Sequence, residues 1–87
     1  MNTIERADRA AKLLGDPVLS DAFAAVEKAI HDQWAATPLR DRDGAHELRL
    51  MLKLLRDVRA NLERAVNDGK VETLLKEQEK RRFSLFR

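Results

Sequence analysis

The chain contains no cysteine and no tyrosine, and only three glycines and two prolines among its 87 residues. Without cysteine, neither a disulfide nor a thiolate metal site can form, and a cytoplasmic protein is the natural expectation. A composition that is 44 % hydrophobic and 37 % charged excludes disorder of the whole chain and a collagen-like repeat. Alanine, leucine, arginine, lysine and glutamate are abundant, so the composition favours helix.

Long apolar runs are also missing. No uncharged apolar stretch approaches the roughly 20 residues that a membrane-spanning helix needs. We therefore expect no membrane association.

Residues that carry catalytic or metal chemistry are scarce. The only histidines, His31 and His46, are too few for a zinc site unless carboxylates such as Asp32 or Glu47 join them. The chain has no glycine-rich phosphate loop, and no serine lies beside a histidine. We predict a protein that is not an enzyme, with no catalytic residues, metal site or cofactor.

Capping signals predict two helices in the first half of the chain. Asn2 or Thr3 can cap a short helix over residues 3–14. Asp16–Pro17 is a strong start signal for a second helix over 17–36, because aspartate caps free N–H groups and proline suits the first turn. Thr37–Pro38 should end it, since the residue before proline disfavours helical backbone.

The pattern in the second half of the sequence predicts a longer helix over residues 44–68, capped by Asp43, and a C-terminal helix over residues 71–82. We expect a break or kink between them at Gly69. The short connector after residue 36 favours an antiparallel hairpin of helices 17–36 and 44–68. The predicted fold is therefore all-α, with one helical domain over 1–82 and a flexible basic and aromatic tail over 83–87.

The longest predicted helix carries more apolar surface than one neighbour can cover. Its predicted hairpin core repeats at intervals of three and four residues, as helical periodicity requires: Leu48, Met51, Leu55, Val58 and Leu62. Leu50 and Leu54 widen this surface, which predicts self-association. The alternative is a closed monomer of three or four helices.

Leu50, Leu54 and Trp34 are the candidate interface residues. Trp34 follows the apolar side of helix 17–36 near its end. Its alternative role is a core residue whose indole N–H bonds a carbonyl.

Charge is unevenly distributed along the sequence. Residues 16–47 carry three basic and seven acidic side chains, whereas residues 48–87 carry eleven basic and six acidic ones. The basic half is therefore a candidate for binding a protein partner or nucleic acid. The candidate docking residues lie at its end: Lys76, Lys80, Arg81, Arg82, Phe83 and Phe86. The alternative is a solvated helix end whose cations complement the helix dipole.

Three segments carry a resemblance to a known group of proteins. They are Asp16–Pro17 before an alanine- and phenylalanine-rich helix, the segment Trp34–Asp41, and the Leu50–Leu55 run that leads to Asp68-Gly69-Lys70. Together they resemble short helical phage and prophage proteins encoded near DNA-packaging genes, some of which are similar to small terminase subunits. The resemblance implies helical hairpins that assemble into rings in the host cytoplasm. It assigns no role to an individual residue.

The predicted function is a helical oligomerisation or adaptor protein, with phage virion assembly or DNA packaging as the role that the resemblance implies. One alternative is a nucleic-acid-binding protein that uses the basic C-terminal half. Another is a small inhibitor or antitoxin-like protein that caps one host partner.

Overall fold

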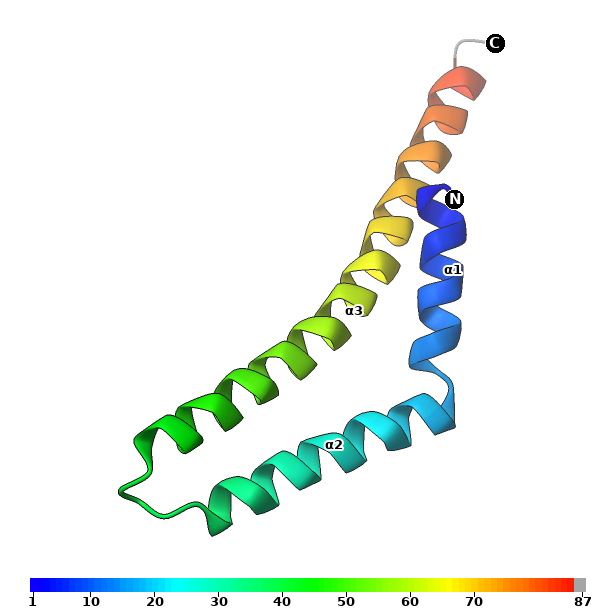
Figure 1. Ribbon diagram of the computed structural model, residues 1–87. Helices are drawn as coiled ribbons and strands as arrows, with labels where there is room; N and C mark the ends of the chain where they lie inside the picture. Colours follow the sequence, from blue (N-terminus) through cyan, green and yellow to red (C-terminus); the bar gives the residue numbers. More distant parts are fainter. Residues whose placement is uncertain (86–87) are drawn as a thin grey trace. The chain divides into compact units, whose positions relative to one another are not determined.

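The computed structural model describes residues 1–85, with the side chains of residues 1–82, and these residues form three helices (Figure 1). They are α1 (Thr3–Leu14), α2 (Pro17–Ala36) and α3 (Arg42–Leu85). The described residues contain no strand, so the all-α prediction is confirmed. The bounds of α1 and α2 agree with the predicted ranges.

The ends of α1 and α2 follow from local capping. The Asn2 side chain accepts a hydrogen bond from the Glu5 N–H at 2.8 Å. The Asp16 carboxylate accepts one from the Val18 N–H, also at 2.8 Å. Each cap satisfies an N–H group that has no partner within its helix. At the other end of α2, Thr37 has extended backbone, as its position before proline requires.

The start of α3 differs slightly from the prediction. Asp41, rather than Asp43, caps this helix, because its carboxylate accepts the Gly44 N–H at 2.9 Å. Its backbone carbonyl also accepts the Ala45 N–H at 3.1 Å. The helix therefore begins at Arg42.

The predicted break at Gly69 and the separate helix 71–82 are wrong. Helix α3 continues through Gly69 to Leu85, and no glycine among the described residues has positive φ. A mid-helix glycine costs only about 1 kcal/mol relative to alanine. Here Gly69 is buried, and a Cβ atom at this position would overlap the Cβ of Ala7 on α1. The close packing of α1 explains why a glycine occupies a continuous helix.

The predicted tail is helical as far as Leu85, while Phe86 and Arg87 lie outside the described residues. The flexibility expected for residues 83–87 stays a prediction.

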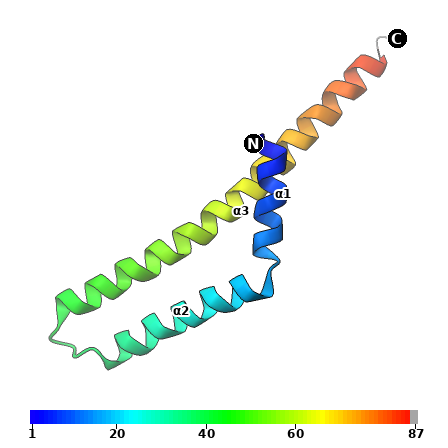
Figure 2. The same cartoon turned by 45° about the vertical axis from the view of Figure 1, so that its right-hand side comes forward.

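Contacts divide the chain into two compact units. One comprises residues 1–14 with 61–87, and the other comprises residues 15–60. The sequence pattern gave no sign of this division, because α3 contributes to both units. Within residues 15–60, α2 and the first part of α3 lie side by side and run in opposite directions (Figures 1 and 2). Within the other unit, Ala7 of α1 contacts Gly69 of α3.

Few apolar side chains are buried. Ile30 and Leu48 form the core of residues 15–60, whereas Ala7 and Ala10 are buried in the other unit. Among the five residues predicted for the hairpin core, one is buried (Leu48), two are half-buried (Leu55 and Leu62) and two are exposed (Met51 and Val58).

Helix geometry explains why two of the predicted core residues are outside. On an α-helix, Leu48, Leu52 and Leu55 fall within about 60° of one another, whereas Val58 lies about 80° from Leu48. Since α2 covers the side that carries Leu48, the neighbouring side with Met51 and Val58 faces solvent.

Candidate functional site

The first part of α3 exposes an apolar surface, which we call the α3 apolar stripe. It consists of four residues within residues 15–60, each between 46 % and 64 % exposed: Leu50, Met51, Leu54 and Val58. At about 100° per residue these side chains share one quarter to one third of the helix circumference. The predicted interface residues Leu50 and Leu54 therefore lie together, and both are exposed.

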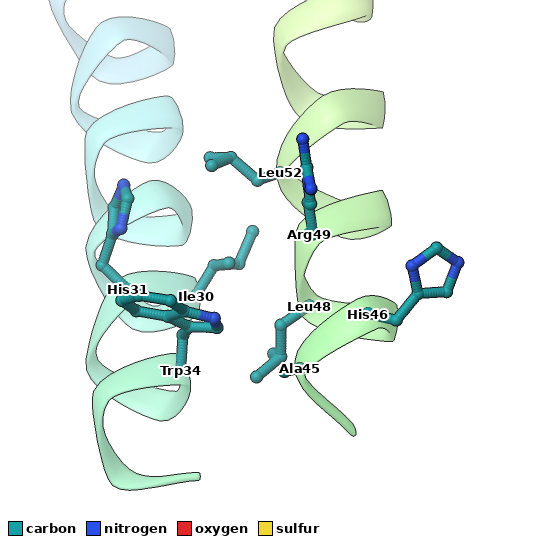
Figure 3. A pocket seen from close by; sticks show the side chains of 8 residues that line it. All are labelled: Ile30, His31, Trp34, Ala45, His46, Leu48, Arg49 and Leu52. Carbon is teal, nitrogen blue, oxygen red and sulfur yellow. The ribbon is translucent and has the colours of Figure 1, made fainter. Parts of the chain in front are cut away.

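A second apolar feature, the end groove, lies between the last turns of α2 and the first turns of α3 (Figure 3). It has a volume of about 500 Å³, and its apolar lining consists of Ile30, Trp34, Ala45, Leu48 and Leu52. Polar residues at its edges are His31, His46 and Arg49. Figure 3 shows Ile30, Leu48 and Leu52 pointing into the space between the helices, whereas His46 points away from α2.

Trp34, the third predicted interface residue, is placed at this groove. It lies beside Ile30 on the α2 side and is 57 % exposed, so it is not a buried core residue. Its role as an interface residue stays a prediction. The structure thus places the three interface candidates on two different surfaces of the same unit.

Leu39, which the sequence does not single out, is the most exposed large apolar side chain among residues 1–82, at 102 % of its reference area. It occupies the turn between α2 and α3, in which the Asp41 N–H donates to the Pro38 carbonyl at 2.9 Å. A leucine directly after proline in an otherwise polar connector is the sequence signal that could have identified it.

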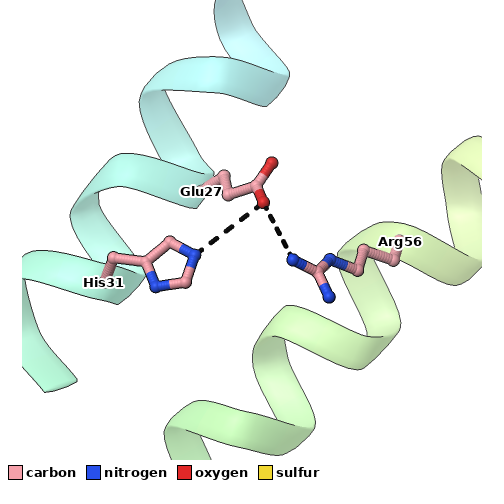
Figure 4. A network of polar contacts seen from close by, with 3 residues as sticks. All are labelled: Glu27, His31 and Arg56. Atoms are coloured by element: carbon pink, nitrogen blue, oxygen red, sulfur yellow. Dashed lines mark hydrogen bonds and ion pairs between the residues drawn. The ribbon is translucent and has the colours of Figure 1, made fainter.

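One polar network joins α2 to α3 (Figure 4). The Arg56 guanidinium donates to the Glu27 carboxylate at 3.2 Å, and the His31 Nε2 lies 3.8 Å from the same oxygen. These side chains are between 39 % and 63 % exposed, so the ion pair contributes little to stability.

Neither histidine belongs to a metal-binding cluster in the described part of the chain. His31 contacts Glu27, whereas His46 lies on α3 at the edge of the end groove. No group of three or more histidine, aspartate or glutamate side chains among residues 1–85 is placed to hold a metal ion.

The basic docking candidates lie on the second part of α3. Lys76, Lys80, Arg81 and Arg82 are all exposed. At about 100° per residue, they are distributed over roughly 240° of the helix circumference and do not form one basic face. Phe83 lies within α3, but its side chain and the whole of Phe86 are outside the described part of the structure.

None of the helices within residues 1–85 combines the length and apolar character that crossing a membrane requires.

Comparisons with protein-family models, with curated proteins and with solved structures found no match to this chain. The resemblance to small terminase subunits therefore stays a prediction. The geometry of the α3 apolar stripe and the end groove is the basis for a functional proposal.

Proposed function

We propose that this protein is a non-enzymatic oligomerisation module, whose copies associate through the α3 apolar stripe. The observation that carries the proposal is the exposure of Leu50, Met51, Leu54 and Val58 on a unit that buries only Ile30 and Leu48. An apolar surface of this kind is typical of a protein–protein contact. A symmetric pair would cover the same stripe on both copies.

The stripe supplies a useful but limited free energy. Full burial of a large apolar side chain contributes about 1.5–3 kcal/mol. Because each of the four side chains is already about half covered, one stripe would contribute roughly 3–6 kcal/mol, and a symmetric pair roughly twice that. Association itself costs about 4–15 kcal/mol. The stripe alone therefore supports weak association, and further contacts would have to strengthen it.

A role of this module in phage assembly or DNA packaging rests on the sequence resemblance alone. An adaptor function through the C-terminal docking candidates rests on the charge and exposure of Lys76, Lys80, Arg81 and Arg82. The scattered arrangement of these cations fits contact with a partner protein better than tracking along a nucleic-acid backbone, which requires one basic surface.

Leu54→Asp tests the stripe directly. Leu54 is 64 % exposed, so a charged side chain there should leave the helices intact but should be excluded from an apolar interface. Leu74→Asp is the matched control, because Leu74 is a similarly exposed leucine on α3 outside the stripe. Light scattering coupled to size-exclusion chromatography gives the mass, and far-ultraviolet circular dichroism checks the helix content.

The wild-type protein should have a mass above 10.0 kDa at micromolar concentration. Leu54→Asp should weaken association at least about tenfold, equivalent to about 1.4 kcal/mol, while Leu74→Asp retains the wild-type mass. A monomeric wild-type protein would refute the proposal. An equal loss of mass in both variants would refute the assignment of the stripe.

A further inference from the structure

The turn between α2 and α3 holds a leucine in solvent by an ordered set of hydrogen bonds. The Asp41 N–H bonds to the Pro38 carbonyl at 2.9 Å, and the Thr37 hydroxyl donates to the Gln33 carbonyl at 2.7 Å. On the other side, the Asp41 carboxylate caps α3. Leu39 is therefore 102 % exposed in a well-bonded turn rather than in a loose loop. The Leu39 side chain is therefore available for contact with a partner at this end of the unit.

The end groove adjoins this turn. Trp34 lies in the last turn of α2, three residues before Thr37, and Ala45 lies in the first turn of α3. The groove, at about 500 Å³, is lined mainly by apolar side chains and has a volume typical of a binding pocket. An apolar projection and an apolar recess therefore lie at the same end of residues 15–60. A two-fold symmetric contact requires this kind of self-complementary surface.

The charged residues of the turn indicate which kind of partner can bind beside the end groove. Arg40, Asp41, Arg42 and Asp43 alternate in sign and are exposed. Within the described part of the chain, the side chains of Arg40, Arg42 and Asp43 make no hydrogen bond or ion pair. When two copies of this segment meet in opposite directions, arginines of one face aspartates of the other. A partner with charge of one sign would leave either the arginines or the aspartates opposed by like charge.

We infer that this end of the unit is a contact between two copies, in which Leu39 of each copy enters the end groove of the other. The inference rests on the proposed self-association. The contact through Leu39 involves a different surface from the proposed self-association, since the turn and the end groove share no residue with the α3 apolar stripe. Two different two-fold contacts on one chain would join pairs into a larger assembly.

Trp34 provides a direct measurement, because it is the only tryptophan in the chain and lies in the groove. We would record its emission maximum and its quenching by acrylamide while diluting the full-length protein from about 100 μM to about 0.1 μM, which covers the expected range of association. The key variant is Leu39→Asp. The matched control is Val18→Asp, which changes another exposed apolar residue, 76 % accessible, at the opposite end of α2.

The expected result is a red shift of Trp34 emission and easier quenching as the wild-type protein is diluted. Leu39→Asp should show the solvent-exposed spectrum at all concentrations, with association at this contact weakened at least about tenfold. Val18→Asp should follow the wild-type curve. Because the Leu39 side chain is fully exposed, Leu39→Asp should keep the wild-type circular dichroism spectrum.

Identical dilution curves for the wild type and Leu39→Asp would overturn the inference. So would a Trp34 emission that stays constant while light scattering shows the wild-type assembly dissociating, although the proposed function would then stand. A wild-type protein that is monomeric throughout would overturn both proposals. Association that Leu54→Asp leaves intact and Leu39→Asp abolishes would support this contact and refute the stripe.

Discussion

Gly69 shows how one residue determines the approach of two helices. It is the buried glycine of α3, and a Cβ atom added to it would overlap the Cβ of Ala7, with the Thr3 carbonyl oxygen 3.6 Å away. Because an alanine methyl group cannot rotate out of the way, relief of this overlap requires α1 to move. Glycine is therefore required here by a close approach and not by an unusual backbone conformation.

Gly69→Ala should lower the stability of the unit formed by α1 and the second part of α3. The substitution gains about 1 kcal/mol of helix propensity but introduces an overlap that typically costs about 1–3 kcal/mol. We expect a lower melting temperature by circular dichroism and faster hydrogen exchange of the α1 amides. The control, Asn67→Ala, lies on an exposed position of the same helix and should not lower the melting temperature.

Ala7→Gly combined with Gly69→Ala should restore part of the lost protection in α1, since it removes the methyl group that the new side chain meets. Unchanged exchange rates in the single variant Gly69→Ala would show that α1 is not held by this contact.

At the scale of elements, α3 is a helix with one covered and one open side within residues 15–60. Leu48 is 7 % exposed beside α2, whereas Met51, less than one turn away, is 51 % exposed. The sequence assigns both residues to the same periodic core. The structure distinguishes them, so they form a natural pair for mutation.

Leu48→Ala should lower the free energy of unfolding by about 2–4 kcal/mol, because it leaves a cavity against α2. Met51→Ala should change it by no more than about 0.5 kcal/mol at protein concentrations where the chain is monomeric. Urea unfolding followed by circular dichroism measures both values. Equal destabilisation by the two substitutions would mean that Met51 is also covered within a single copy.

For the whole molecule, the distribution of charge separates the proposed function from its main rival. The second half of the sequence is basic, but Lys76, Lys80, Arg81 and Arg82 are spread around α3 and are interspersed with glutamates. Apolar association depends little on ionic strength, whereas contacts with a nucleic-acid backbone release counterions and weaken steeply as salt increases.

The association constant of the wild-type protein should therefore change by less than about threefold between 50 and 200 mM salt, apart from mild screening of charges at the turn. Light scattering at both salt concentrations measures the association constant. Binding to a DNA duplex, followed in parallel by fluorescence anisotropy, should be weak. A duplex affinity that is high at 50 mM salt and falls about a thousandfold by 200 mM would favour the nucleic-acid-binding alternative.

The exposure of Leu50 and Leu54 could be predicted from the sequence, because the apolar residues of this helix extend around more of its circumference than one neighbouring helix covers. Their role at an interface stays a prediction. Leu39 was missed because a single apolar residue in a polar connector has no periodicity. Its importance depends on the hydrogen-bonded turn that holds it in solvent and on the groove beside it.

The amino-acid order alone specified an all-helical chain and the ends of α1 and α2, because caps and prolines act on the backbone over only a few residues. Three features depended on tertiary packing: the continuity of α3 through Gly69, the side of α3 that is buried, and the exposure of Trp34. Helical periodicity predicts which residues form the apolar side of a helix, but it does not predict where the neighbouring helices pack against that side. The position of α1 against Gly69 decided the first of these outcomes, and the position of α2 against Leu48 decided the second.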